Sequence, residues 1–392
     1  MEKKNPSSDK MSVRHRIVYI AAGLLQGGAE SILYRLVSAT KDGWEVSVIS
    51  LSDDGHYGEK LRALGVAVFC CDMPRGRVSV SGLKRLCHFV NLARPDVIQT
   101  WMYHADLLGG AVARLMGYRS VVWGVRASIL GRGKAFYSAC MAARLCAILS
   151  KMIPISIIFC SQESARLHQK RGYVKDKFIV IPNGYDCSRL RTNETARQQM
   201  RSTWGVLPEE LLLGMVARWD PLKDHANLLN AFHRLAVERD NVRCVLVGEG
   251  MDESNSALVS LVRQHDVMGK VILAGPSDNI TAVMNALDLH VLSSVGEAFP
   301  NVVAEAMACG TPCVVTNVGD AGLIVGNTGW VVPPSDPKAL FQAMELALSK
   351  LSEEGGAFWG AASRSRILQS FSLEKMVSSY EDTWTKAMRG AN

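Results

Sequence analysis

Short apolar runs rich in β-branched residues alternate with longer amphipathic segments through the first half of the chain. The short runs predict strands, and the segments with apolar residues three and four positions apart predict helices. Helices are expected over Ala29–Thr40 and in a segment that ends near Pro95. This alternation predicts a parallel sheet with helices on both faces. The predicted strands are Ile17–Ala22, Glu45–Leu51, Val66–Cys70, Val97–Thr100, Ser120–Val125, Ile155–Cys160 and Phe178–Ile181.

The same pattern restarts after Asn183-Gly184, with further helices over Thr195–Trp204 and Leu228–Glu238. The further strands are Leu211–Val216, Arg243–Val247, Val271–Ala274, His290–Leu292 and Pro312–Thr316. We therefore expect an α/β protein with two Rossmann-like, doubly wound domains, whose ligands bind outside the carboxyl ends of the strands. The expected divisions are a disordered tail (1–16), a first domain (17–185), a linker (Ile181–Leu190), a second domain (186–372) and a last helix (373–388) that packs back on the first domain.

The charge of this chain of 392 residues is unevenly distributed, although the net charge is only +7. Residues 1–185 hold 26 Lys and Arg against 13 Asp and Glu, whereas residues 186–392 hold 18 against 24. This asymmetry suggests two domains with different partners. The basic half could face anionic lipid, an acidic acceptor or nucleic acid, or it could be a solvated basic surface.

The ten cysteines include no C-x-x-C pair, which disfavours a zinc or redox motif and indicates buried thiols in a reducing compartment. The first sixteen residues contain no apolar run that could serve in a signal peptide. The most apolar stretch, Ala139–Cys160, is interrupted by Arg144, Lys151 and Pro154, so no transmembrane helix is expected. These features favour a cytoplasmic protein.

Two acids bracket a predicted helix start in the segment that ends at Gly310. Pro300 suits the first turn of this helix, because it lacks the N–H that would go unbonded there. Free N–H groups near Phe299–Val302 would make an anion site, with Glu297 before it and Glu305 inside the helix. A nucleotide sugar would supply a phosphate for the amides and hydroxyls for the carboxylates. On spacing alone, Glu297 could equally be a capping acid and Glu305 a solvated helix residue.

The segment from Glu297 to Glu305 resembles the E-x-F-P-x-x-x-x-E signature of the family 4 retaining glycosyltransferases, and the following residues continue the family's E-A-M-A-x-G-x-P run. The resemblance implies the GT-B fold, in which two Rossmann-like domains face each other across a donor-binding cleft. It implies that Glu297 holds the donor sugar and that Glu305 holds the ribose. The donor phosphates would then lie at the helix start, at Phe299, Pro300, Asn301 and Val302.

Other segments follow the family's order across nearly the whole chain. Gly27 and Gly28 begin a segment similar to the family's G-G-A-E, where glycines let the backbone approach a phosphate or acceptor. Residues 180–186 resemble its I-P-N-G-x-D linker. Arg218 and Lys223 resemble its R-x-x-x-x-K pair, in which two cations would neutralise a diphosphate, the Arg through paired N–H groups and the Lys as a point charge.

The segment Trp101–Gly109 resembles a variant common among polysaccharide- and O-antigen-type members of the family. This likeness places His104 against the donor sugar, where imidazole could hydrogen-bond a hydroxyl or the charge that develops at the anomeric carbon. Arg126 could reach the donor phosphate or an acidic acceptor. Purely structural roles for His104 and Arg126 are the alternatives. Asp224 departs from the glycine that usually follows Lys223, which leaves the geometry of that loop open.

No Asp-x-Asp occurs in the chain, which argues against a glycosyltransferase that grips the diphosphate through a divalent metal. Cations and a helix N-terminus would do that work, so we expect metal-independent activity and no cofactor. Gly248-Glu-Gly250 lacks the full G-x-G-x-x-G, which disfavours a nicotinamide site.

The resemblance implies transfer of a hexose, with retention, from a UDP- or GDP-linked donor to an acceptor hydroxyl. Exopolysaccharide, O-antigen or other cell-surface glycan synthesis is the expected setting. The expected partners are a glycan or polyprenyl-linked acceptor and an anionic membrane surface on the cytoplasmic side, which the basic first domain would contact; no nucleic acid is expected. The alternatives are a sugar-nucleotide epimerase on the same fold and a non-catalytic module that binds nucleotide sugar.

Overall fold

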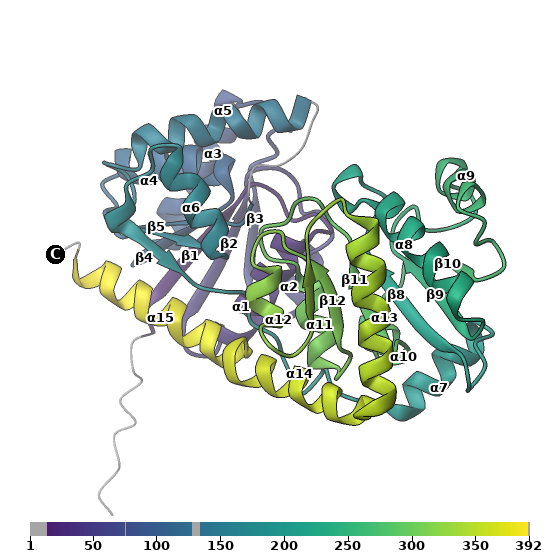
Figure 1. Cartoon of the computed structure of the whole chain (residues 1–392). Coiled ribbons are helices and arrows are strands. Elements are labelled where there is room, and N and C mark those ends of the chain that lie inside the picture. Colours follow the sequence, from purple (N-terminus) through teal and green to yellow (C-terminus); the bar gives the residue numbers. More distant parts are fainter. Residues whose placement is uncertain (1–13, 75, 128–133, 391–392) are drawn as a thin grey trace, which may run out of the picture. The chain divides into compact units, whose positions relative to one another are not determined.

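Two parallel β-sheets organise the chain in the computed structural model, which describes residues 14–74, 76–127 and 134–390 (Figure 1). Within these residues the first sheet has seven strands in the order β3-β2-β1-β4-β5-β6-β7, and the second has six in the order β10-β9-β8-β11-β12-β13. The strand pairs described in both sheets are parallel. In each sheet the direction of winding changes beside the first strand, as in a doubly wound fold. The predicted α/β class with two Rossmann-like sheets is confirmed.

The first sheet and its helices come from the first half of the chain. Each predicted strand is present within one residue at either end; Arg16, predicted in the tail, already belongs to β1, and residues 1–13 of that tail lie outside the described residues. The strands are β1 (Arg16–Ala21), β2 (Glu45–Ser50), β3 (Ala67–Cys70), β4 (Val97–Trp101), β5 (Val121–Val125), β6 (Ser156–Phe159) and β7 (Phe178–Val180). The helices are α1 (Gly28–Thr40), α2 (Gly58–Ala63), α3 (Val80–Ala93), a π-helical turn (Ala105–Gly109), α4 (Gly110–Leu115), α5 (Lys134–Leu149), α6 (Gln162–Lys170) and a 3-10 turn (Lys175–Lys177).

The second sheet repeats this plan, and its predicted strands are also present within one residue. The prediction missed the short edge strand β13 and helices α9, α10, α12, α13 and α14, whereas α11 was predicted from Pro300 to Gly310. The strands are β8 (Leu211–Val216), β9 (Val242–Val247), β10 (Val271–Gly275), β11 (Leu289–Leu292), β12 (Cys313–Thr316) and β13 (Trp330–Val332). The helices are α7 (Glu194–Thr203), a 3-10 turn (Pro221–Lys223), α8 (His225–Glu238), α9 (Ser256–Gln264), α10 (Ile280–Ala286), α11 (Asn301–Ala308), α12 (Ala321–Val325), α13 (Pro337–Glu353), α14 (Gly356–Ser370) and α15 (Leu373–Arg389).

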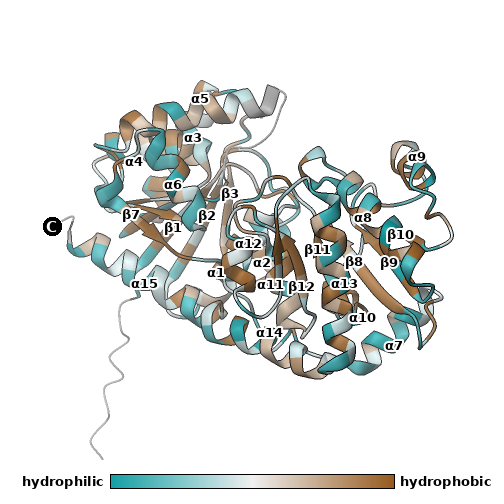
Figure 2. Ribbon diagram, viewed as in Figure 1, coloured by the Kyte–Doolittle hydropathy of each residue, from teal (hydrophilic) through white to brown (hydrophobic). Residues whose placement is uncertain are grey.

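The second sheet is buried on both faces, which explains why its strands are continuous apolar runs (Figure 2). Leu212 and Val245 belong to one core cluster, whereas their neighbours Leu213 and Leu246 belong to another. Successive side chains of a strand point to opposite faces, so each strand contributes to both clusters. Helices on each face are therefore needed to exclude water from the sheet.

The described chain forms two compact units. The first holds the chain up to Gly124, the segment Met152–Ser156 and the chain from Trp384 onward, and the second holds Val125–Lys151 and Ile157–Thr383. Within the first unit, the buried Trp384 ring packs edge-on against Tyr19 and Trp44. Its Nε1–H donates to Gln99 Oε1 at 3.0 Å. The domain boundary near residue 185, which follows the sheets rather than these units, stays a prediction from the sequence.

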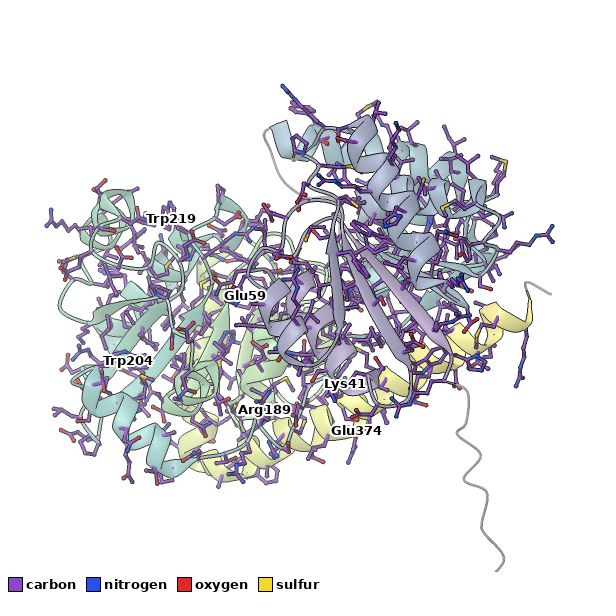
Figure 3. All side chains as sticks on the ribbon, turned by 180° about the vertical axis from the view of Figure 1, so that it is seen from behind. Lys41, Glu59, Arg189, Trp204, Trp219 and Glu374 are labelled. Atoms are coloured by element: carbon purple, nitrogen blue, oxygen red, sulfur yellow. The ribbon has the colours of Figure 1, made fainter. Side chains whose placement is uncertain are left out.

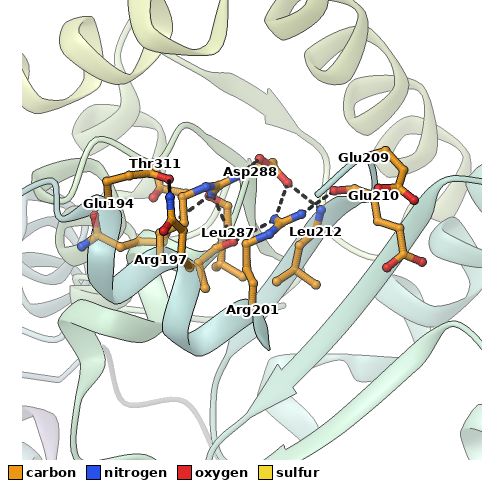
Figure 4. A network of polar contacts seen from close by, with 12 residues as sticks. Glu194, Arg197, Arg201, Glu209, Glu210, Leu212, Leu287, Asp288 and Thr311 are labelled. Atoms are coloured by element: carbon orange, nitrogen blue, oxygen red, sulfur yellow. Dashed lines mark hydrogen bonds and ion pairs between the residues drawn. The ribbon is translucent and has the colours of Figure 1, made fainter. Parts of the chain in front are cut away.

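Asp288, just before β11, anchors helix α7 within the second unit (Figure 4). Its carboxylate accepts hydrogen bonds from Arg197 Nη2 at 2.6 Å and from Arg201 Nη1 at 3.0 Å. It also accepts one from the Leu212 backbone N–H at 2.7 Å. The Arg201 side chain is only 7% exposed, so the charge of Asp288 neutralises a buried guanidinium.

Replacing Asp288 by alanine is expected to lower the free energy of unfolding by about 3 kcal/mol, because it leaves the buried Arg201 without its anion. Denaturation in urea measures this loss. Asp240→Ala is the matched control, since the Asp240 side chain is fully exposed and pairs with Lys270 at 3.7 Å. The control should leave the free energy of unfolding close to that of the wild type. Equal losses in the two variants would contradict the anchoring role of Asp288.

Candidate functional site

The loops after β8 and β11 meet at the switch point of the second sheet, where the two strands are hydrogen-bonded neighbours. Arg218 and Lys223 follow β8, and Glu297 follows β11. The Ser293 hydroxyl, at the end of β11, donates a hydrogen bond to the Lys223 carbonyl oxygen at 2.8 Å. The two loops are thus bound to each other, and they carry the cations and the carboxylate that were predicted separately.

Lys223 and Glu297 form an ion pair across these loops. Lys223 Nζ lies 2.5 Å from Glu297 Oε1, although the two residues are 74 positions apart in the sequence. The Ser294 hydroxyl donates a second hydrogen bond to the same Oε1 at 2.8 Å. Both charged side chains are largely buried, with 20% and 13% exposure. An ion pair with so little water around it is stronger than one on an open surface.

Arg218 lies in the same loop but is not part of this ion pair. Its side chain is 64% exposed, and its Nη2 lies 2.8 Å from Asp220 Oδ2. Burial would raise the pKa of Asp220, but the Leu222 amide and the Arg218 guanidinium together lower it. Trp219, labelled in Figure 3, packs against His225 with the rings tilted by 32° and their centroids 5.0 Å apart. The guanidinium of Arg218 is therefore held at one end of the loop and remains accessible.

Asp224 determines the geometry of the loop after Lys223, at the position where the family usually has glycine. Its backbone is in the left-handed region, with φ +48° and ψ +55°, where glycine is usually favoured and Asp is tolerated. Its carboxylate accepts from the Asn227 N–H and so caps α8. The backbone after Lys223 thus adopts a conformation that glycine would also adopt, and the aspartate side chain in addition caps α8.

Helix α11 begins at Asn301, directly after the segment that holds Glu297. Pro300 is the residue before the first turn rather than within it, because its ψ of 96° is extended, so the predicted start was one residue early. The Phe299 side chain is buried and packs against Phe371 with ring centroids 5.8 Å apart. Phe299 can therefore offer a ligand only its backbone. An α-helix leaves its first N–H groups without intrahelical acceptors, here from Asn301 and Val302 onward.

A chain of buried polar side chains holds this helix start in the second unit. The Asn301 Oδ1 atom accepts from Asn183 Nδ2 at 2.7 Å and from the Tyr185 hydroxyl at 2.6 Å. Arg126 then donates to Asn183 Oδ1 at 2.7 Å and to the Tyr380 hydroxyl at 2.9 Å. The I-P-N-G-like linker is therefore tied to α11. These contacts give Arg126 a positioning role, while its predicted contact with a phosphate or an acceptor stays a prediction.

Glu305 lies in the middle of α11 and is only 7% exposed. This burial is inconsistent with the alternative in which Glu305 is a solvated helix residue. Carboxylates are seldom buried unless they bind a polar group. The assignment of Glu305 to the ribose stays a prediction.

The switch point of the first sheet lies between β1 and β4, and it carries the other predicted residues. Gly27 precedes α1 as its N-cap and Gly28 is the first helical residue. The Trp101 Nε1–H at the end of β4 donates to the Ala29 carbonyl at 2.9 Å, which ties the two loops together. His104 follows β4 and is half-buried, and this burial lowers the pKa of its imidazole. The imidazole is therefore favoured in its neutral form, which can both donate and accept a hydrogen bond.

Asp106 supports the backbone turn that carries His104. Its fully buried carboxylate accepts from the Thr100 hydroxyl at 2.5 Å and from the Gly124 N–H at 3.3 Å. The chain here turns through Met102, with φ +75°, into a π-helical turn over Ala105–Gly109. Such backbone is costly and is often found at functional sites. Asp106 lies within the motif Trp101–Gly109, but no role was predicted for it.

Asp106 should make stability pH-dependent, because burial raises its pKa from an ordinary value of 3.8 to about 7. Between these values the folded protein holds a proton that the unfolded chain has released. The contribution of Asp106 to stability therefore falls as pH rises from about 4 to about 7, and then stays constant. Asp106→Asn removes this titration. The difference in free energy of unfolding between wild type and variant should fall across this pH range; a constant difference would contradict the burial of an ionisable Asp106.

Several residues that support the site were not predicted. They act through hydrogen bonds to predicted residues: Ser293, Ser294, Asn183, Tyr185 and Tyr380. Asn183 alone had a sequence clue, since it belongs to the I-P-N-G-like motif. Scattered hydroxyl and amide side chains give no periodic pattern, so their partners become visible only in the folded chain.

The described part of the chain has neither a cluster of candidate metal ligands nor a helix able to cross a membrane. No group of three or more His, Cys, Asp or Glu side chains there is arranged to hold a metal ion. Among the same residues, no helix combines the length and the apolar character that crossing a bilayer requires.

Solved structures share this two-sheet architecture. The Anabaena protein Alr3699/HepE, solved in complex with UDP, has a TM-score of 0.82 at 20% identity, with 95% of this chain and 100% of that chain covered. A glycosyltransferase from Rickettsia africae has a TM-score of 0.82 at 18% identity, with 96% and 99% covered. These likenesses define the class of fold: two Rossmann-like sheets of the GT-B type.

Sequence comparison gives the family. The family model described as Glycosyltransferase Family 4 matches residues 26–189, and that described as Glycosyl transferases group 1 matches residues 210–350. The chain belongs to this family of glycosyltransferases, as its motifs predicted.

Individual relatives agree with this assignment. EpsF of Bacillus subtilis, which bears the name of a glycosyltransferase, is 25% identical over 80% of this chain and 83% of its own. An Escherichia coli relative named UDP-Gal:alpha-D-GlcNAc-diphosphoundecaprenol alpha-1,3-galactosyltransferase is 23% identical over 83% and 84%. The D-inositol 3-phosphate glycosyltransferase of Rhodococcus opacus is 31% identical, but the match covers only 55% of this chain and 49% of that one.

Proposed function

We propose that this glycosyltransferase moves a hexose, with retention of configuration, from a nucleoside diphosphate sugar to a hydroxyl of a cell-surface glycan precursor. The observation that carries the proposal is the Lys223–Glu297 ion pair, which joins the two switch-point loops beside the start of α11. Two further points support it. Alr3699/HepE was solved with UDP and with UDP-glucose. The Escherichia coli relative is named for a UDP-Gal donor and a diphosphoundecaprenol-linked acceptor.

In this proposal the donor diphosphate binds at Lys223, Arg218 and the first amides of α11. The ammonium group of Lys223 has three N–H donors, so it can contact Glu297 and a phosphate oxygen together. Negative charge grows on the diphosphate as the bond to the sugar breaks. Preorganised cations and amides stabilise that charge in the transition state. Stabilisation of the leaving group in this way requires no metal ion or cofactor.

The carboxylates are assigned to the two ends of the donor. The hydrogen bonds of Glu297 described above both go to Oε1, so we assign Oε2 to a hydroxyl of the hexose. Glu305 would accept from the ribose hydroxyls. His104 would contact the sugar as well, and Gly27 with Gly28 would let the acceptor or phosphate approach the backbone.

The donor and the stereochemistry are tested together. A panel of UDP- and GDP-sugars is screened by thermal shift, because a ligand that binds only the folded state raises its stability as RT ln(1 + [L]/Kd). The stabilising donor is then incubated with acceptor, and the anomeric configuration of the product is read by NMR. Retention supports the proposal, and inversion contradicts it. An epimer formed from donor alone would show an epimerase, and binding without turnover on any acceptor would show a binding module.

Metal independence has a separate test. Transfer should persist after treatment with a chelator, because Arg218, Lys223 and α11 supply the positive field. Complete loss of activity that a divalent cation restores would contradict this part of the proposal.

We also propose that the protein works in the cytoplasm at the inner face of the membrane, where a polyprenyl-linked acceptor would be presented. The excess of 26 basic over 13 acidic residues in positions 1–185 supports attraction to anionic lipid. Binding to anionic vesicles should weaken as salt is added, since added ions screen the attraction.

A further inference from the structure

Among the described side chains of helix α5, from Tyr137 onward, most of the large apolar ones lie outward and the small ones lie inward. The inward positions Ala142, Ala143, Cys146 and Ala147 are buried. In a helix that only covers a protein core, the larger apolar residues face the core and polar residues face water. The outward apolar residues of the helix and of the turn after it are between 44% and 70% exposed: Tyr137, Met141, Leu145, Ile148 and Met152.

The outward residues form one continuous stripe. Met141, Leu145 and Ile148 are spaced four and three positions apart, which places them on one side of the helix. Figure 2 shows the mixed colouring of α5, with hydrophobic segments along it. Single exposed apolar residues are normal, but a contiguous row of them marks an interaction surface.

The charged residues of this face are all basic. Arg144 is exposed between Met141 and Ile148, and Lys151 is exposed just after the helix. No Asp or Glu occurs anywhere from Leu107 to Gln162 in the sequence. A face with large apolar side chains and only positive charge matches an anionic lipid surface, because the apolar groups enter the boundary of the acyl chains while the cations meet the headgroups.

We propose that this face of α5, defined by Met141, Arg144, Leu145, Ile148 and Lys151, docks the protein on an anionic phospholipid bilayer. The occupant is assigned from charge: a second copy would bring the same cations against themselves, whereas anionic headgroups neutralise both. The inference extends the proposed membrane location by naming the surface that makes the contact. It does not depend on which donor or acceptor the enzyme uses.

The experiment compares the wild-type chain with a triple variant, Met141→Ser, Leu145→Ser and Ile148→Ser. Binding is measured by co-sedimentation with phosphatidylcholine vesicles, with and without phosphatidylglycerol. The matched control carries three serines at similarly exposed apolar positions of α13 and α14: Leu346, Phe358 and Leu368. A second variant, Arg144→Gln with Lys151→Gln, removes the charge and keeps the apolar stripe.

Wild type and control should bind the vesicles that contain phosphatidylglycerol, and the serine variant should bind at least about tenfold more weakly. The glutamine variant should lose most of its preference for phosphatidylglycerol. The inference is overturned if the serine variant binds like wild type, if wild type binds no vesicle at low salt, or if the serine changes instead dissociate a dimer. Thermal shift with nucleotide sugar on the same samples separates the two proposals: donor binding with no vesicle binding rejects only the docking face, and the reverse rejects only the donor assignment.

Discussion

Replacing Lys223 by alanine should lower kcat/KM for the nucleotide-sugar donor by about 100- to 1000-fold, the usual loss when a preorganised group that stabilises developing charge is removed. Lys223 is the largely buried cation of the switch-point loops, 2.5 Å from Glu297 Oε1. Arg218 cannot replace it, because Arg218 is bound to Asp220 and lies mostly in water. The loss should appear in kcat as well as in KM, since the charge on the diphosphate grows in the transition state.

Loss of folding must be separated from loss of catalysis in this experiment. Lys223→Ala also leaves Glu297 without its cation, which should lower stability. The double variant Lys223→Ala with Glu297→Gln removes both charges, so it should recover stability but not activity. Lys350→Ala is the control, because Lys350 pairs with Glu354 on the surface of α13. Full activity in a folded Lys223→Ala variant would show that Lys223 does not bind the donor phosphates.

Replacing Glu297 by glutamine should lower kcat by about 100-fold or more, because a charged acceptor on the reacting sugar is lost and Lys223 is left partly uncompensated. The change is nearly isosteric, and the Ser294 hydroxyl can still donate to the amide oxygen. Glu305→Gln makes the same chemical change eight residues later, in the middle of α11. It should raise the donor KM by about tenfold with a smaller effect on kcat, since the ribose does not react.

The contrast between the two glutamine variants tests the assignment of the donor's ends. Single-turnover and steady-state rates are measured for both at saturating and limiting donor. Opposite behaviour, with kcat lost in Glu305→Gln and only KM changed in Glu297→Gln, would mean that the sugar and the ribose are exchanged. Unchanged kinetics in both variants would show that neither carboxylate binds the donor.

Much of the fold was predictable because local patterns of apolar and polar residues specify its helices and strands. Strand β8 was predicted with its observed bounds, and helices α1 and α15 within one residue at each end. These elements are strongly periodic or strongly apolar, so a short window contains the needed information. Strand β13 was missed because three residues at a sheet edge carry almost no pattern. Helix α5 was considered only as a broken membrane span, because its outward face is as apolar as a buried one.

The residues of the candidate site could be predicted from the sequence, but the contacts between them could not. Glu297, Glu305, Arg218 and Lys223 could be named because a family motif marks them. The motif does not say that Lys223 and Glu297 form an ion pair or that Arg218 binds Asp220 instead. Nor does spacing reveal that Asn183 and Tyr185 converge on Asn301. Those contacts depend on which strands become neighbours.

Periodicity and motif therefore established the class of fold and the family and named the candidate donor residues, since each of these depends on residues close together in the chain. Tertiary structure decided the rest. It brought residues 74 positions apart into one ion pair by making β8 and β11 neighbours. It also buried Glu305 and Asp106 and turned the large side chains of α5 outward. Burial and pairing are properties of packed surfaces, and no local pattern specifies which surfaces meet.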